Sequence, residues 1–171
     1  MKPAEICQLI QAHLRDDDCQ LLENAYDPSI RVPASRVFAV MEFLKASQDL
    51  DFTVLMNQTA SHHDTELRLY WHLYSYSQKH HLTVESAVPV DQPQVSSVVK
   101  LWPSADWLER ETYDLFGIIF SGHPDLRRIM LPEDWEGFPL RKDYQIPDQY
   151  NDMDHRPSDL TLSFKPKGKT K

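Results

Sequence analysis

The stretch from Leu108 to Tyr144 concentrates the residue types that could do chemistry, with carboxylates, arginines and a histidine among aromatic side chains. Glu109 and Glu111 are the obvious pair for general acid and base catalysis. The spacing around them is helical, and residues two apart on a helix point about 160° apart, so the two carboxylates cannot face one substrate. We therefore do not expect a carboxylate pair of the glycosidase kind.

Histidines provide two further candidate sites. His62 and His63 precede Asp64, but consecutive histidines diverge in a strand or loop, and no further His or acid spacing completes a ligand set. A polar hairpin turn is the expected role of this cluster. His123 lies between a glycine and a proline, which favours a turn residue or an interface hydrogen bond over a general base.

Composition narrows the classes of function further. The chain has 171 residues, a formal net charge of −8 and a pI near 5.4, which fits one hydrophobic core and argues against a nucleic-acid or anionic membrane partner. Cys7 and Cys19 are too few for a cysteine-ligated iron–sulfur cluster and lack the spacing of a zinc site, so we expect both to be reduced and structural. No phosphate loop, nucleophile elbow or dinucleotide fingerprint is present. Neither a signal peptide nor a membrane-spanning run is recognisable, so we expect the chain to stay in the compartment where it is made.

Hydrophobic periodicity predicts an α+β fold, in which a mostly antiparallel β-sheet is packed by two to three helices and followed by a long extended C-terminal arm. The run 66–75 alternates most clearly, with Leu67, Leu69, Trp71 and Leu73 on one face. With the runs 52–57 and 81–88 it predicts an antiparallel meander that packs helices on one side. Helices are expected over 4–15 and after Pro33, the latter with a stripe of Val37, Val40, Met41 and Leu44, and a short strand pair over 19–25 and 29–32.

A further helix begins at Pro103-Ser104 and ends at Gly117, which occupies the position of a C-terminal glycine cap. Its expected apolar stripe is Ala105, Leu108, Thr112, Leu115 and Phe116. Prolines and glycines follow frequently after this point, so residues 118–160 should be extended and irregular. We accordingly divide the chain into an α+β domain over 1–117 and an irregular arm over 118–171.

The helix face away from the apolar stripe is expected to carry Trp107, Arg110 and Asp114. Arg110 and Asp114 are four residues apart and can pair, but an exposed pair of this kind stabilises a helix by only about 0.3–0.5 kcal/mol. A tryptophan beside an arginine is typical of an interface anchor. An ordinary solvated face with one stray tryptophan is the alternative.

The arm repeats this composition without any period. Its apolar groups cannot be buried by a local amphipathic element, so they must pack on this domain's own surface or on another protein, and we favour a partner. Internal ion pairing with neighbouring acids is the alternative for the basic side chains. The expected partner-contacting residues are Trp107, Glu109, Arg110, Glu111, Asp114, His123, Arg127, Arg128, Trp135, Arg141, Lys142, Asp143 and Tyr144.

Three blocks carry a resemblance to a known family. In their order and spacing they resemble the signature of the C-type, or 30 kDa-type, subunit of proton-translocating NADH-quinone oxidoreductase, the respiratory complex I. The resemblance extends more loosely over residues 50–145, and the family usually has a histidine where this chain has Phe138. The blocks are Glu109-Arg-Glu-Thr-Tyr-Asp-Leu-Phe-Gly117, Gly122-His-Pro-Asp-Leu-Arg-Arg128 and Trp135-Glu-Gly-Phe-Pro-Leu-Arg-Lys-Asp-Tyr144.

The resemblance implies a hydrophilic scaffold subunit of the peripheral arm with no active site and no cofactor of its own. FMN and iron–sulfur clusters would lie in partner subunits, and contact with NADH, quinone and the membrane would come only through the complex. The implied neighbours are the large D-type subunit, which helps form the quinone site, and the subunit carrying the terminal cluster. The implied location is the cytoplasmic side of the inner (plasma) membrane, and an organelle-encoded equivalent is also possible.

Two alternatives remain open at this point. The same module serves related membrane-bound hydrogenases and other quinone-reducing complexes, and this chain would not touch the electron donor in any of them. A free-standing hydrolase that uses its carboxylates is the more distant alternative. Co-purifying subunits distinguish all three possibilities.

Overall fold

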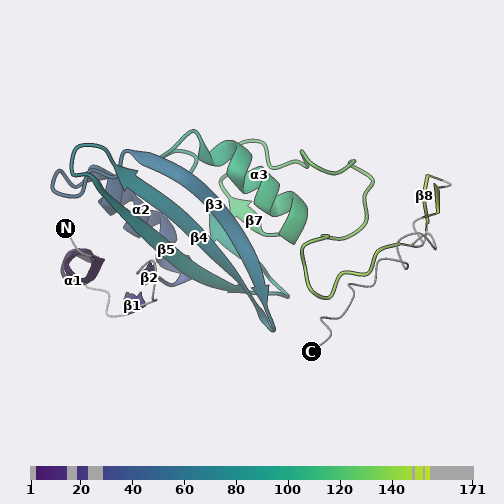
Figure 1. Cartoon of the computed structure of the whole chain (residues 1–171), viewed down its shortest axis with the longest axis horizontal. Helices are drawn as coiled ribbons and strands as arrows, with labels where there is room; N and C mark the ends of the chain where they lie inside the picture. The colour runs from purple at the N-terminus through teal and green to yellow at the C-terminus, as the bar shows by residue number, and fades with distance from the viewer. Residues whose placement is uncertain (1–2, 15–18, 23–28, 148, 152, 155–171) are drawn as a thin grey trace, which may run out of the picture.

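The computed structural model describes residues 3–14, 19–22, 29–147, 149–151 and 153–154 (Figure 1). Helices and short strands form its N-terminal part, a β-meander its centre, and a helix followed by irregular chain its C-terminal part. The elements are α1 (Pro3–Leu14), β1 (Gln20–Leu22), β2 (Ser29–Arg31), the 3₁₀ turn η1 (Ala34–Arg36), α2 (Val37–Ala46), β3 (Val54–His63), β4 (Glu66–Ser75), β5 (His80–Pro89), β6 (Gln94–Ser96), α3 (Ala105–Phe116), β7 (Ile119–Ser121), β8 (Gln149–Tyr150) and β9 (Met153–Asp154).

The main sheet has five strands in the order β1-β2-β5-β4-β3. β3, β4 and β5 form the expected antiparallel meander, and β1 pairs antiparallel with β2 as expected. β2 runs parallel to β5, which makes the sheet mixed, though still mostly antiparallel. The predicted α+β class is thereby confirmed.

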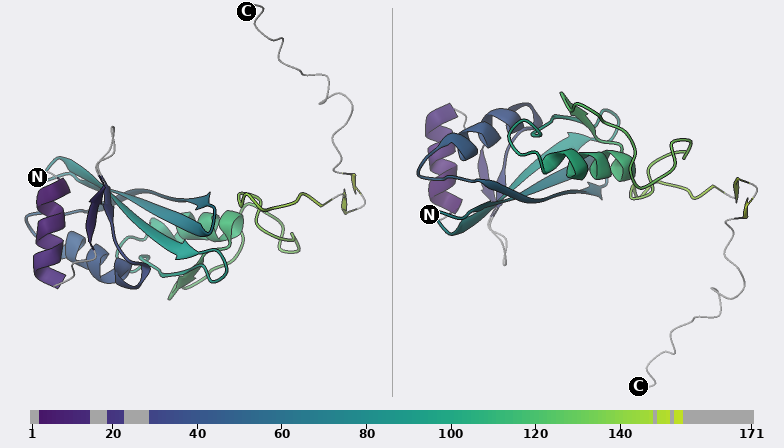
Figure 2. Two further views of the ribbon diagram at one scale, coloured as in Figure 1. Left: turned by 90° about the horizontal axis from the view of Figure 1, so that it is seen from below. Right: turned by 90° about the horizontal axis from the view of Figure 1, so that it is seen from above.

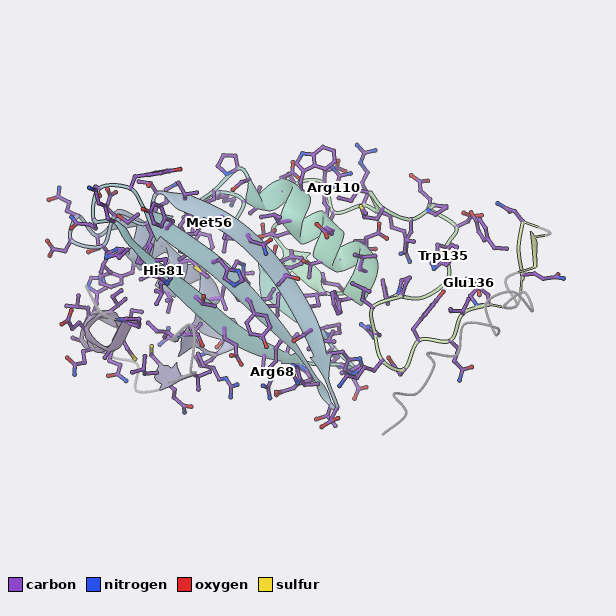
Figure 3. The ribbon with its side chains drawn as sticks, viewed as in Figure 1. Met56, Arg68, His81, Arg110, Trp135 and Glu136 are labelled. Carbon is purple, nitrogen blue, oxygen red and sulfur yellow. The ribbon has the colours of Figure 1, made fainter. Side chains whose placement is uncertain are left out.

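β4 separates the two faces of this sheet. Leu67, Leu69, Trp71 and Leu73 are fully buried in the core, while the alternate residues of the strand are only half-buried. α2 and α3 lie on the buried face, and the opposite face is open (Figure 2). Met56, Arg68 and His81 project from that open face (Figure 3). The strand therefore carries a one-sided core, as its alternation predicts.

β3 is longer than the sequence indicates, because it continues from Val54 through His63. Its later buried positions include Gln58 and His62, whose polarity hides the period of 2. The expected hairpin turn at His62-His63-Asp64 is shifted by two residues. Both histidines end the strand, and the turn begins at Asp64, which has a φ of 46°.

The hydrophobic core continues past α3. Ile118 and Phe120 are 0% and 2% exposed, and β7 pairs in parallel with β6. Beyond β7, residues 122–147 contain no helix or strand, which agrees with the expected irregular arm. The division of the chain into a domain and an arm at residue 117 stays a prediction. The Lys-rich end of the chain, 165–171, lies outside the described residues.

Candidate functional site

The geometry of α3 decides where most of the predicted site residues lie. The helix begins at Ala105, and Gly117 ends it in the left-handed conformation with a φ of 73°, donating its N–H to the Tyr113 carbonyl at 2.8 Å. Ser104 does not cap the helix through its side chain, because its hydroxyl donates to the Leu55 carbonyl at 3.4 Å. The predicted boundaries are confirmed, but the role expected of Ser104 is not.

The prediction of a solvent-facing surface on α3 is right for Trp107 and wrong for its two neighbours. Trp107 is 64% exposed, whereas Arg110 is 6% and Asp114 0% exposed. The arm covers this side of the helix, and Arg110 Nε donates to the carbonyl oxygen of Arg127 at 3.3 Å. The Arg110 guanidinium also lies over the Trp107 ring, 4.9 Å from its centroid.

Asp114 anchors the arm to the helix through both of its carboxylate oxygens. Oδ1 accepts a hydrogen bond from Arg128 Nη1 at 2.7 Å, and Oδ2 accepts from the backbone N–H groups of Ile129, Met130 and Leu131 at 2.9, 2.6 and 3.0 Å. We call Asp114, Arg128 and residues 129–131 the Asp114 clasp. Burial acts to raise the pKa of Asp114, but these hydrogen bonds outweigh it and hold the pKa below its usual value.

Arg128 also fixes the next part of the arm. Its Nη2 donates to the carbonyl oxygens of Trp135 and Gly137, both at 3.0 Å. One guanidinium thus joins α3 to two points of the irregular segment that follows. For Arg128 the structure shows internal ion pairing, with Asp114, which was the alternative considered for the basic residues of the arm.

Phe138 closes the arm over the end of α3. A Cβ atom added to Gly117 would lie 2.5 Å from the Phe138 ring, so the glycine is needed for this approach as well as for its positive φ. The guanidinium groups of Arg128 and Arg141 lie 5.3 and 4.9 Å from the ring centroid. Arg141 Nε also donates to the Phe116 carbonyl at 2.6 Å, satisfying a carbonyl in the last turn of the helix.

His62 links the arm to the tip of the β3–β4 hairpin. Its Nδ1 accepts the backbone N–H of Lys142 at 3.0 Å, so Nε2 carries the proton and donates to the Asp64 carbonyl at 3.1 Å. Asp143 lies 3.7 Å from Nδ1 and is largely exposed. His62 thus serves a structural contact between segments 80 residues apart in the chain, whereas His63 bonds the Ser61 hydroxyl on its own strand at 3.0 Å.

Glu109 and Glu111 lie in different environments, as their helical spacing predicts. Glu109 is fully buried, and its two oxygens accept hydrogen bonds from the Ser97 hydroxyl at 2.6 Å and the Val98 N–H at 2.7 Å. Burial raises the pKa of Glu109 to about 7, although both hydrogen bonds lower it. Glu111 is exposed. The two carboxylates therefore do not share a site.

His123 sits in a turn and is enclosed by its own chain. Nδ1 accepts the Asp125 N–H at 3.0 Å, and Nε2 donates to the Asp106 carbonyl at 3.2 Å. Its side chain is fully buried. Of the two roles expected for His123, the structure shows that of a turn residue.

The remaining arm residues include both enclosed and exposed groups. The rings of Trp135 and Tyr150 are in contact, with centroids 5.1 Å apart and planes tilted by 51°, and Tyr144 packs against Gly137. Arg127 is mostly exposed and pairs with Asp125 at 2.9 Å. The exposed large apolar residues of this region are Trp107, Ile119, Met130, Leu140 and Ile146.

One contributor to this surface, Met130, was missed from the sequence, whereas Leu140 is one of the apolar residues of the arm that were expected to pack on a surface. Met130 is 63% exposed and Leu140 is 52% exposed. The backbone N–H of each is bonded to α3, that of Met130 to the Asp114 carboxylate and that of Leu140 to the Leu115 carbonyl. No periodic signal marks Met130, because the clasp that positions it uses backbone N–H groups. The contact surface on α3 and the arm stays a prediction. Those of its predicted residues that are buried in this chain would support the surface and would not touch a partner.

The polar side chains of this region hold the arm against α3. Within the described ranges, no group of three or more His, Cys, Asp and Glu side chains could hold a metal ion. No helix in the same part of the chain is long and apolar enough to cross a membrane. The polar groups that are brought together on α3 are engaged by backbone donors and by Arg128.

Comparison with known proteins identifies relatives in sequence and in structure. The chain is 39% identical over 140 residues to the C-type subunit of NADH-quinone oxidoreductase from Roseiflexus castenholzii, with 80% of each protein covered. The trypsin-resistant fragment (1–134) of Nqo5 superposes with a TM-score of 0.62 at 27% identity, covering 74% of this chain and all of the fragment.

A second solved structure shares the fold alone. A chain of the membrane-bound sulfane sulfur reductase, an archaeal respiratory membrane complex, superposes with a TM-score of 0.70 at 24% identity, over 85% of this chain and 87% of that one. The sequence match is more specific, since the family model of the respiratory-chain NADH dehydrogenase 30 kDa subunit matches residues 30–150. With these residues and the identity to the Roseiflexus protein, the chain belongs to the family of the 30 kDa subunit of respiratory-chain NADH dehydrogenase.

Proposed function

We propose that this chain is the 30 kDa (C-type) component of an NADH-quinone oxidoreductase, where it acts as a scaffold in the peripheral arm and contributes no catalytic group. The observation that carries the proposal is the family match over residues 30–150, which includes the whole of α3 and most of the described arm. Electron transfer from NADH to quinone, and the proton translocation coupled to it, are properties of the assembly. Assembly of that complex is what this chain supplies.

The Asp114 clasp supports a scaffold role because it gives an irregular segment a fixed shape. Four hydrogen bonds to one buried carboxylate hold residues 128–131 on α3, and Phe138 with Arg141 holds the next part on the end of the helix. A surface fixed before binding loses less conformational entropy on association than a mobile one. The arm is thus suited to lie against a neighbouring subunit.

The residues suited to anchor that contact are exposed and apolar. Trp107, Met130, Leu140 and Ile146 are 64%, 63%, 52% and 69% exposed. Tryptophan is among the residues that carry most of the binding energy at the centre of an interface, methionine is enriched there, and charged neighbours such as Lys142 suit its rim. We assign the large D-type subunit as the main partner and the subunit with the terminal cluster as the second.

The proposal extends to cofactors and location. FMN and the iron–sulfur clusters belong to partner subunits, and this chain holds none of them. It lies on the cytoplasmic side of the inner (plasma) membrane, or on the corresponding side in an organelle, and reaches the membrane, NADH and quinone only through the complex. Reacting centres need fixed positions, and rigid supporting elements provide them.

Affinity purification of the tagged chain from mildly solubilised membranes tests the proposal. Recovery of flavin- and cluster-bearing subunits with NADH-driven quinone reduction is the expected result. Recovery with hydrogenase subunits would assign the chain to the related complex considered from the sequence. A chain recovered alone from the soluble fraction would contradict both assignments to a complex and would favour the free-standing hydrolase considered from the sequence.

Matched variants test the contact surface itself. Trp107→Ala should lower the recovery of partner subunits about tenfold or more, the effect expected when an interface anchor is truncated. Arg141→Ala should lower the amount of assembled complex without changing the affinity of that complex for NADH. Tyr76→Ala is the control, because Tyr76 is 71% exposed at the β4–β5 turn, away from α3 and the arm. Equal losses in all three variants, or normal assembly with impaired turnover in Arg141→Ala, would contradict the assignment.

A further inference from the structure

Cys7 and Cys19 form a close pair of thiols that the proposed function does not use. Their Sγ atoms lie 3.3 Å apart, although one residue belongs to α1 and the other directly precedes β1. The side chains are almost completely enclosed, since Cys7 is 5% and Cys19 3% exposed. The sequence suggested two structural cysteines with separate roles, and such roles do not explain why the two sulfur atoms lie so close together.

Other contacts hold the two cysteines in register. Gln11 Nε2 donates to the Cys19 carbonyl oxygen at 2.7 Å, and the Cys7 thiol lies 3.5 Å from the same oxygen. Both donors come from α1, so the helix fixes the backbone of Cys19 as well as approaching its sulfur. A bond between the two sulfurs requires their separation to fall from 3.3 Å to about 2.05 Å, which is a small movement for side chains.

The chemistry open to this pair is oxidation to a disulfide. A metal site would need further ligands, and among the described residues no third His, Cys, Asp or Glu joins the two thiols. The surroundings are closely packed and mostly apolar, with Ile10, Val32 and Val40 around Cys19, and Arg36 belongs to the same lining. Such an enclosure favours a small oxidant over a bulky one, and reduction by a dithiol therefore requires a local opening of α1 that exposes the sulfurs.

We propose that Cys7 and Cys19 are a reversible disulfide site that is oxidised by hydrogen peroxide and reduced by a dithiol. One thiolate attacks a peroxide oxygen, forming a sulfenic acid and releasing hydroxide, which takes up the proton lost from that thiol to give water. The second sulfur then attacks the sulfenic sulfur, forming the S–S bond and releasing a second water. Two electrons pass from the two sulfurs to the peroxide, and a dithiol returns them by exchange.

The bond would fasten α1 to the edge of the main sheet. α1 packs against β1, β2 and α2, and β1 is the outermost strand next to β2. The disulfide would close a short loop between residues 7 and 19 and so restrict the unfolded chain. Oxidation therefore strengthens the attachment of the N-terminal helix without changing the arm.

Differential alkylation of the purified full chain tests the site. After treatment with hydrogen peroxide, both thiols should resist alkylation in denaturant, and digestion should yield one peptide pair joined through Cys7 and Cys19. Dithiothreitol should restore both thiols. In Cys7→Ser, the remaining Cys19 should stay alkylatable or oxidise beyond sulfenic acid, with no internal link. Full alkylation of the treated wild-type chain, or independent oxidation of each sulfur, would overturn the proposal.

Thermal unfolding separates a bond that fastens α1 from one that forms without structural effect. Oxidised wild-type chain should melt about 5–10 °C above the reduced chain, as a disulfide closing a short loop predicts. Cys7→Ser and Cys19→Ser should show no such rise after the same treatment. An oxidised wild-type chain that melts at or below the temperature of the reduced chain would overturn the role given to the bond.

Discussion

The β3–β5 meander and the described part of the arm that follows α3 are held in place by different forces. The meander buries a regular row of apolar side chains, with Leu67, Leu69, Trp71 and Leu73 all at 0% exposure. The part of the arm that the structure describes has no such row. It is held by Asp114, by Arg128 and by one aromatic ring on Gly117.

The difference predicts how each region fails. Apolar burial in the meander is spread over many side chains, so removing one leaves the others in place. The arm depends on a few polar groups that are buried, and a buried donor left without its acceptor costs about 1–3 kcal/mol. Single polar substitutions should therefore release the arm while the sheet stays folded.

Asp114→Ala should have the largest effect on the arm. It leaves the Arg128 guanidinium, whose side chain is 13% exposed, without its carboxylate and three backbone N–H groups without an acceptor, at a cost of about 3 kcal/mol or more. Hydrogen exchange at the amides of residues 129–131 should then be on the order of 100-fold faster. The amides of β4 should exchange at their wild-type rates.

Glu111→Ala is the matched control, since it removes an exposed carboxylate from the same helix. We expect it to leave exchange in the arm within about twofold of wild type, as for most surface substitutions. If Asp114→Ala accelerated exchange equally in β4 and in the arm, the two regions would be one cooperative unit and the contrast between them would be lost.

Glu109→Gln should change how stability depends on pH. Burial raises the pKa of Glu109 from 4.5 to about 7, so the folded chain binds a proton more tightly than the unfolded chain. The stability from this group is fully present below pH 4.5, is lost as the pH rises to about 7, and then levels off. The total loss is about 3 kcal/mol by linkage.

Glutamine imitates the protonated form, because its carbonyl can accept the Val98 N–H while its amide donates to the Ser97 hydroxyl. Urea unfolding between pH 4.5 and 8 should show a difference between variant and wild type that grows in favour of the variant by about 2–3 kcal/mol. Glu111→Gln, on the exposed side, should give a constant difference. A constant difference for Glu109→Gln as well would show that folding does not raise the pKa of Glu109.

The parts of the fold that could be predicted from the sequence are those marked by a local pattern of residue types. The alternation of β4, the stripe of α2 and the Gly117 cap of α3 all match the structure, because each depends on local spacing. β3 was predicted too short, since Gln58 and His62 occupy buried positions of the strand. Parallel pairing of β2 with β5 has no local signal at all.

The sequence predicted which residue types the candidate site contains, but not which of these residues touch one another. Trp107 is exposed as expected, yet Arg110 and Asp114 are covered by the arm. Helical spacing places both on the face away from the core, and it contains no information about a segment that folds back from 14 residues later to pair with Asp114. Hydrogen bonds from backbone N–H groups, as in the clasp, cannot be read from side-chain types.

Phe138 and Gly117 provide a smaller and more specific test of how the arm is closed. Gly117→Ala strains a positive φ and drives a Cβ into the Phe138 ring. Phe138→Ala should cost about 1–2 kcal/mol in the local stability of the arm, because the ring is only half-buried. The double variant should lose less than the sum of the two single losses, since the clash disappears with the ring. Additive losses measured by hydrogen exchange near Arg141 would show that the two residues act separately.

His62→Ala should have the smallest effect and the most local one. It removes the acceptor of the Lys142 N–H, whose bond to Nδ1 is the hydrogen bond between the arm and the β3–β4 hairpin, at a cost of about 1 kcal/mol. Exchange of the Lys142 amide should therefore be on the order of fivefold faster. The neighbouring Arg141 amide is an internal control, because it donates to the Phe138 carbonyl at 3.1 Å and does not depend on the histidine. Faster exchange at both amides would mean that the hairpin supports the whole end of the arm, so that the sheet and the arm would be coupled through His62.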